Sequence, residues 1–87
     1  PECGNGWLRL IDAVLKTVEH FDPEFKIRQI KEKFGGLRIY LDTTAPDMEP
    51  VIELAQKIAL FTCEITGKPG KLIEDGGWYR VRAAGVK

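Results

Sequence analysis

The sequence predicts an α+β fold in which a helix, a β-hairpin, a second helix and a second β-hairpin follow one another, with an antiparallel sheet packed against the two helices. Two observations predict this order. Two segments repeat apolar residues at helical spacing, and each is followed by two strand-like segments joined through a short glycine-containing connection. Such connections are too short for the crossover that parallel strands need, so both strand pairs are expected to be antiparallel.

The chain of 87 residues is long enough for one domain, which we take as residues 1–87. It begins with Pro1 and its one methionine is Met48, so we expect either a removed initiator or a fragment of a slightly longer chain. A hydrophobic fraction of 44% and a charged fraction of 30% are typical of a globular protein. No apolar run approaches the ~20 residues that cross a bilayer, which predicts no association with a membrane.

The first helix is expected over residues 6–20. The sequence Asp22-Pro23 predicts its end, because proline cannot continue the helical hydrogen bonds and restricts the residue before it. Apolar residues recur at i, i+3 and i+4 spacing and form one stripe, which comprises Trp7, Leu10, Ile11, Val14, Leu15, Val18 and Phe21.

Residues 25–43 predict the first hairpin. The alternation of apolar and charged residues is broken at Ile30, which predicts a bulge near Gln29. Gly35 and Gly36 predict the turn, because both can adopt a positive φ. In the returning strand one face is expected to carry Leu37, Ile39 and Leu41, and the other Arg38, Tyr40 and Asp42.

A loop over residues 43–50 leads into the second expected helix. Thr44 or Asp47 is a candidate for its N-terminal cap, and prolines are tolerated in a first turn. The buried face of this helix is expected to comprise Val51, Ile52, Ala55, Ile58, Ala59 and Thr62.

The second hairpin is expected from two short strands, residues 71–73 and 78–83, joined by the turn residues 75–77. Because a domain of this size has a small core, aromatic residues must supply much of it. Trp7 and Trp78 are therefore both expected to be structural, each with its polar atom at an edge of the core.

The cysteines predict a cytoplasmic location. Secreted domains of this size usually carry several disulfides, whereas this chain has two cysteines, Cys3 and Cys63, far apart in sequence. We expect two small buried or half-buried thiols rather than a disulfide.

No catalytic constellation is evident, so we expect no enzymatic activity, no metal and no cofactor. The chain contains no serine, which excludes a serine triad, and His20 with Cys63 is the one conceivable pair of base and nucleophile. A tetrahedral zinc site needs four ligands, and the turn-like segment 62–70 contains only Cys63. Two groups of carboxylates allow two interpretations, a weak cation site or solvated surface, and we expect the second: Glu19, Asp22 and Glu24, and Asp42 and Asp47.

The densest basic segment lies in the first expected hairpin. Glu32 is the one acidic residue within this segment, and Phe34 is expected at the tip of the hairpin. Arg80 and Arg82 would extend the basic segment if the last strand lay nearby. Its basic residues are Lys26, Arg28, Lys31, Lys33 and Arg38. Two interpretations stay open: a surface that binds an acidic protein or a phosphate backbone, and a solvated strand whose lysines protect an edge from aggregation. The candidate partner-binding residues are Lys31, Lys33, Phe34, Arg38 and Arg28.

The chain resembles a family of small, uncharacterised bacterial and phage proteins with a Lys-Glu-Lys-Phe-Gly-Gly-Leu-Arg hairpin and a zinc-ribbon-like knuckle near the C-terminus. The matching residues are Cys3-Gly4-Asn5-Gly6-Trp7, residues 31–38, Thr62-Cys63-Glu64, Gly67, Pro69-Gly70 and Gly77-Trp78. The chain departs from the pattern where Thr66 stands in place of a second cysteine, and where Ala83 and Val86 stand near the other pair of ligands. The resemblance implies a degenerate knuckle that has kept its turn and lost its metal, and it implies no activity.

The absence of recognisable chemistry predicts a non-enzymatic interaction protein that binds another protein through the basic hairpin. A bacterial or phage inhibitor, such as an immunity protein that neutralises a toxin, fits this size and composition. The alternative is a nucleic-acid-binding module derived from a zinc-ribbon-like fold. The 13 Lys+Arg balance the 13 Asp+Glu, so nucleic-acid binding through bulk charge is not expected.

Overall fold

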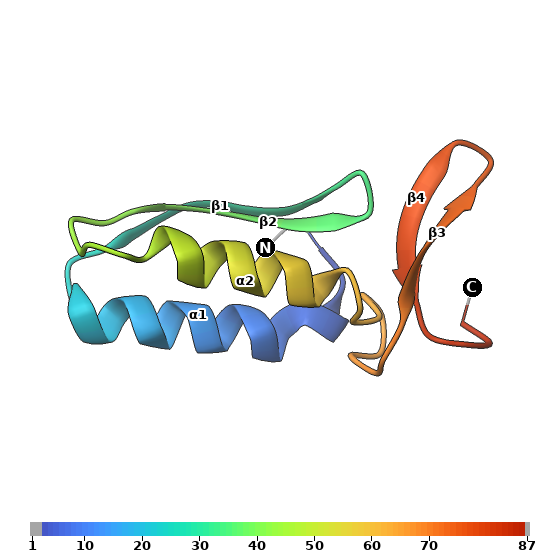
Figure 1. Cartoon of the computed structure of the whole chain (residues 1–87), viewed down its shortest axis with the longest axis horizontal. Helices are drawn as coiled ribbons and strands as arrows, with labels where there is room; N and C mark the ends of the chain where they lie inside the picture. Colours follow the sequence, from blue (N-terminus) through green and yellow to red (C-terminus); the bar gives the residue numbers. More distant parts are fainter. Residues whose placement is uncertain (1–2, 87) are drawn as a thin grey trace.

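The computed structural model describes residues 3–86 and confirms the α+β class with the order helix, hairpin, helix, hairpin (Figure 1). Pro1, Glu2 and Lys87, the ends of the expected domain, lie outside the described residues. The elements are the 3₁₀ turn Asn5–Trp7, α1 Leu8–Phe21, β1 Lys26–Lys33, β2 Gly36–Asp42, α2 Glu49–Ala59, β3 Lys71–Asp75 and β4 Trp78–Arg82.

The strands form two separate two-stranded antiparallel sheets rather than a single sheet. The β1–β2 hairpin runs along the two helices, whereas the β3–β4 hairpin stands beyond their ends (Figure 1). The molecule is correspondingly elongated, with extents of 40 × 22 × 19 Å. Among residues 3–86, no helix combines the length and the apolar character that crossing a membrane requires.

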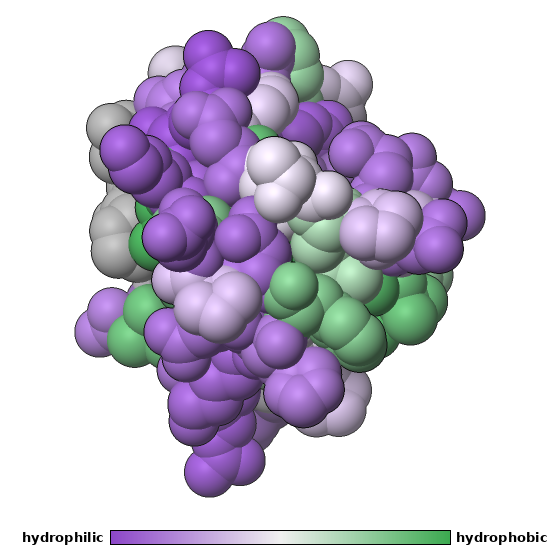
Figure 2. All heavy atoms as spheres, turned by 90° about the vertical axis from the view of Figure 1, so that its left-hand side faces the viewer, coloured by the Kyte–Doolittle hydropathy of each residue, from purple (hydrophilic) through white to green (hydrophobic). Residues whose placement is uncertain are grey.

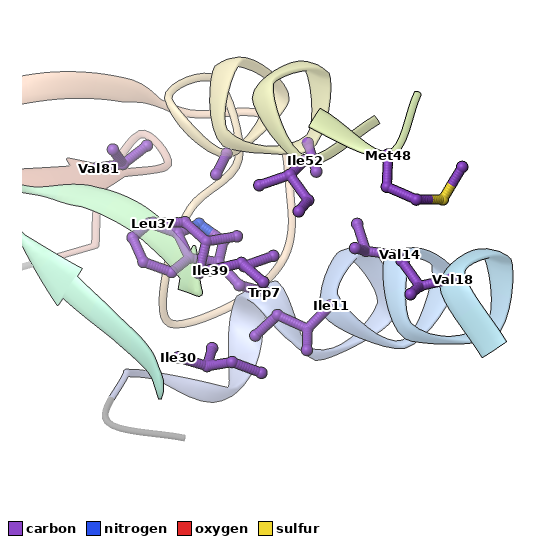
Figure 3. Close-up of a cluster of buried hydrophobic side chains, with 12 residues drawn as sticks. Trp7, Ile11, Val14, Val18, Ile30, Leu37, Ile39, Met48, Ile52 and Val81 are labelled. Atoms are coloured by element: carbon purple, nitrogen blue, oxygen red, sulfur yellow. The ribbon is translucent and has the colours of Figure 1, made fainter. Parts of the chain in front are cut away.

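The core lies where α1, α2 and the β1–β2 hairpin meet (Figure 3). Trp7 is fully buried at its centre, and its indole Nε1 donates a hydrogen bond of 2.8 Å to the carbonyl oxygen of Thr62. This confirms the structural role expected for Trp7, because a buried indole N–H needs an acceptor. The other buried apolar residues are Ile11, Val14, Val18, Ile30, Leu37, Ile39, Met48, Ile52, Ala55, Ala59 and Val81.

The bulge and the faces of the first hairpin agree with the sequence. The register shifts between Ile27 and Gln29, which leaves Arg28 as the extra residue. The turn differs by one residue, because Phe34 (φ 52°) and Gly35 (φ 82°) are its central residues and Gly36 already begins β2. A two-residue hairpin turn of type I′ needs a positive φ at both central positions. Phe34 therefore adopts a backbone conformation that is common for glycine and asparagine and uncommon for phenylalanine.

Helix α2 begins without the cap expected from the sequence. Met48 occupies the cap position and no side chain caps the helix, so the prediction for Thr44 or Asp47 was wrong. Asp47 instead turns the chain with a φ of 64°. Ile58 was expected to be buried and is 44% exposed, because it lies on the border between the core face and the outer face.

The second hairpin is longer in its first strand than expected, and it leaves Trp78 outside the core. Trp78 is 71% exposed, which corrects the expectation of a structural role. The reason is architectural, since Trp78 lies beside the turn of a hairpin that projects beyond the helices (Figure 1). Val81 is the one fully buried residue of this hairpin.

Candidate functional site

The outer face of the β1–β2 hairpin is the surface on which the basic residues gather. Ile30 and Ile39 are paired across the strands and are buried on the inner face. Because side chains alternate between the two faces of a strand, the flanking pairs Gln29–Tyr40 and Lys31–Arg38 lie on the outer face. We define the basic face as these four residues together with Arg28 and Lys33.

Lys31 and Arg38 are directly opposite each other on the basic face. Like charges in this position destabilise a strand pair, so the stability of the hairpin does not explain them. Both residues are half-buried, and Arg38 Nη1 donates a hydrogen bond of 3.1 Å to the carbonyl oxygen of Leu37. Neither of them forms an ion pair with another residue of the segment 3–86.

A shallow depression of about 270 Å³ lies on the basic face, lined by Arg28, Gln29, Lys31 and Tyr40. Tyr40 is 42% exposed there. At this end Arg28 lies 3.7 Å from the carboxylate of Asp42, and both side chains are more than half exposed. An exposed pair of this kind contributes little to stability, roughly 0–1 kcal/mol, and leaves Arg28 free to exchange partners.

The tip of the hairpin presents an exposed aromatic ring beside a cation. Phe34 is 72% exposed, and Lys33 Nζ lies 5.7 Å from the centre of its ring. Glu32, the acid of this segment, is half-buried on the inner face, where its carboxylate accepts the Gly35 N–H at 2.6 Å. Glu32 therefore holds the turn and does not neutralise the basic face.

The tip packs against the second hairpin. A Cβ on Gly35 would lie 2.7 Å from Leu72 Cδ1 and 2.9 Å from the backbone carbon of Tyr79, so only glycine fits here. Tyr79 faces the tip, whereas Arg80 and Arg82 lie on the opposite face of β4, because side chains alternate along a strand.

The expected extension of the basic surface by Arg80 and Arg82 is therefore wrong. Arg82 Nη1 lies 3.4 Å from Glu64 Oε1, with side chains only 11% and 13% exposed, so this guanidinium is part of the interior. Arg80 points away from the side of β4 that meets the first hairpin.

Glu64 joins three segments that are distant in sequence. Its carboxylate accepts the Gly4 N–H at 2.8 Å and pairs with Arg82. Its backbone oxygen accepts the Gly6 N–H at 2.6 Å, and its N–H donates to the Val81 carbonyl at 3.1 Å. The sequence singled out Glu64 only as part of a motif, and no local pattern in a single sequence signals these partners.

Cys63 is fully buried in the turn-like segment, and the Thr66 N–H donates to its Sγ at 3.4 Å. Burial raises the pKa of the Cys63 thiol, but hydrogen bonds from the Thr66 hydroxyl and from the N–H groups of Thr66, Ala83 and Ile65 outweigh it and lower the pKa from 9.0 to about 7. Cys3 is half-buried and both thiols are free, which confirms the expectation of unpaired cysteines. Among residues 3–86, no group of three or more ligand side chains could hold a metal.

The remaining titratable candidates do not come together. Cys63 follows Thr62, which contacts Trp7 next to the start of α1, whereas His20 lies in the last turn of that helix. The two side chains are therefore near opposite ends of a helix that is roughly 20 Å long at 1.5 Å per residue (Figure 1). Asp22 accepts the Thr43 hydroxyl at 2.7 Å and the Thr44 N–H at 3.1 Å. These bonds lower the pKa of Asp22 and give it a structural role, because they tie the end of α1 to the end of β2.

The geometry therefore brings four of the five predicted partner-binding residues together on the outer face of the β1–β2 hairpin, with Phe34 at its tip. Sequence reasoning left out Gln29 and Tyr40, although the alternation of the strand placed Tyr40 on the same side as Arg38. Comparisons with models of known families, with curated proteins and with solved structures found no match to this chain. The family resemblance stays a prediction.

Proposed function

We propose that this chain is a non-enzymatic interaction protein that binds an acidic surface of another protein through the basic face and Phe34. The observation that carries the proposal is the directly opposed pair Lys31 and Arg38, which costs hairpin stability and has no ion-pair partner among residues 3–86. Carboxylates on a partner would relieve this repulsion. The pair is therefore better explained by binding than by folding.

The surroundings of this pair support a protein partner. Tyr40 and Phe34 are exposed aromatic residues beside cations, and aromatic and arginine side chains are enriched where protein interfaces concentrate their energy. The helices pack on the inner face of the hairpin and leave the outer face to solvent. An inhibitor or immunity protein that covers an acidic toxin surface is the specific form of partner that we propose.

The test is capture of partners from a bacterial lysate by the immobilised chain, followed by affinity measurement with the purified partner. We expect Lys31→Glu/Arg38→Glu to weaken binding at least about tenfold, through lost attraction and added repulsion. The matched control is Lys16→Glu/Lys68→Glu, which makes the same charge change at two exposed positions away from the basic face. Equal binding by both double variants would refute the assignment of the basic face.

A single-stranded nucleic acid is the second candidate partner, favoured by Tyr40 lying between Lys31 and Arg28 in the depression. The same face would then provide phosphate contacts and a stacking surface. Fluorescence anisotropy with a labelled oligonucleotide distinguishes this candidate, because phosphate binding weakens steeply as salt is raised. Binding that is abolished by Tyr40→Ala and by added salt would replace the protein partner with a nucleic acid.

A further inference from the structure

The helices carry a second surface that the basic face does not involve. Leu54, Ile58 and Phe61 follow one another at i, i+4 and i+7 along α2 and just beyond it, and are 59%, 44% and 70% exposed. Residues at this spacing lie on one side of a helix and form an exposed apolar stripe. A contiguous exposed apolar stripe of this kind indicates an interface.

The stripe continues into a groove between α1 and α2. The groove has a volume of about 140 Å³ and no charged residue in its lining, which comprises Leu10, Ala13, Val14, Thr17, Val51, Leu54, Ala55 and Ile58. Figure 2 shows hydrophobic side chains gathered on the right of the view, which is the side that faces the reader in Figure 1. The occupant of this groove must therefore present an apolar surface of its own.

The charges beside the stripe indicate what the occupant is. Glu53 and Lys57 directly precede Leu54 and Ile58, so they form a parallel row along the side of the stripe that faces away from α1. Both are exposed, and neither forms an ion pair with another residue between positions 3 and 86. One acid and one base, one helical turn apart and both unpaired, are complementary to the same row running in the opposite direction.

We propose that a second copy of this chain covers the stripe, with the two α2 helices packed antiparallel about a two-fold axis. In this arrangement the same flank of each helix faces its counterpart, as it does in antiparallel helix pairs, and Glu53 of each copy meets Lys57 of the other. The stripe residues of the two copies then cover one another. Because the contact is small, we expect a reversible dimer with a dissociation constant on the order of micromolar.

A heterologous helix could also fill an apolar groove, but it would have to reproduce both the stripe and the inverted charge row. The second copy has both by symmetry. A parallel pair of α2 helices leaves these charges without partners, because a two-fold axis along the helices places the two Glu53–Lys57 rows on opposite sides of the interface. The charges therefore specify the orientation of the two copies as well as their identity.

The experiment is sedimentation velocity across a concentration series, with variants at exposed positions that do not disturb the core. Leu54→Glu and Ile58→Glu are expected to give a monomer at all concentrations. The control is Phe21→Glu, at the last residue of α1, which is apolar, 61% exposed and outside the stripe, and this variant is expected to keep the dimer. Circular dichroism confirms that each variant is folded.

Charge exchange tests the orientation. Glu53→Lys and Lys57→Glu each place like charges across the interface and are expected to weaken dimerisation about tenfold, and the double variant Glu53→Lys/Lys57→Glu is expected to restore it. A monomeric wild-type chain at every concentration overturns the proposal. A dimer that the double variant fails to restore overturns the antiparallel arrangement, and a dimer unaffected by Leu54→Glu assigns the interface elsewhere.

Discussion

At the scale of single residues, Glu64 connects the N-terminal segment to the last strand, β4. Its side chain is 13% exposed, and it bonds to the N-terminal segment through Gly4 and to β4 through Arg82. Removing one partner of a buried ion pair leaves the other charge without compensation. Glu64→Ala is expected to lower the free energy of unfolding by about 3 kcal/mol in urea denaturation.

The control for Glu64 is another ion pair with the opposite exposure. Lys16 and Asp12 lie 2.9 Å apart, but their side chains are 75% and 60% exposed. Asp12→Ala is expected to change the free energy of unfolding by less than about 1 kcal/mol, because solvent screens an exposed pair. Glu64→Gln keeps an acceptor for the Gly4 N–H and is expected to fall between the two. A loss for Glu64→Ala no larger than that for Asp12→Ala would contradict the role of Glu64.

At the scale of elements, the turn of the first hairpin holds Phe34 in a left-handed backbone conformation that phenylalanine does not favour. Phe34 has a φ of 52°, and a left-handed conformation costs a residue with a side chain roughly 1–2 kcal/mol. Phe34→Asn is therefore expected to stabilise the protein by about 1 kcal/mol, since asparagine tolerates this region. The same change should weaken partner capture, because strain retained at an exposed aromatic residue indicates a functional position.

Phe21→Asn is the matched control for the turn. Phe21 is 61% exposed, against 72% for Phe34, does not have a positive φ and lies outside the stripe on α2. Its replacement is expected to leave the free energy of unfolding nearly unchanged. Urea denaturation of both variants separates the backbone effect from the removal of an exposed ring, and an equal response of the two would contradict the strain at Phe34.

At the scale of the whole molecule, the two hairpins differ in how firmly they are held. The β1–β2 hairpin contributes Ile30, Leu37 and Ile39 to the core, whereas the β3–β4 hairpin contributes Val81. Amide hydrogen exchange reports local opening, which is easiest where few apolar contacts hold a segment. The amides of β3 and β4 are therefore expected to exchange faster than those of α1 and α2.

Hydrogen exchange followed by mass spectrometry measures this difference directly. Gly35→Ala tests the contact between the two hairpins, because the added Cβ would overlap Leu72 and Tyr79 and would push the hairpins apart. This variant is expected to accelerate exchange in β3 and β4 more than in α1. Uniform protection of all elements in the wild-type chain would show that the second hairpin opens only with the whole fold.

The sequence by itself determined the order of elements, because helical and strand spacing are local and each glycine-containing connection allows only an antiparallel pair. It also determined that Arg38 lies on the opposite face of β2 from the buried Leu37 and Ile39, since side chains alternate along a strand. It did not determine which glycines are needed for close approach. Gly6 lies against the backbone of Glu64, and Gly4 bonds to a side chain 60 positions away.

Only the tertiary structure decided that the strands form two sheets, that Trp78 is exposed and that Arg82 is an interior residue paired with Glu64. It also showed that Leu54 and Ile58 are both exposed, whereas helical spacing alone predicts that Ile58 is buried. The physical reason is the same in each case. Whether an apolar or charged side chain is covered depends on which distant segment packs beside it, and no local pattern contains that information.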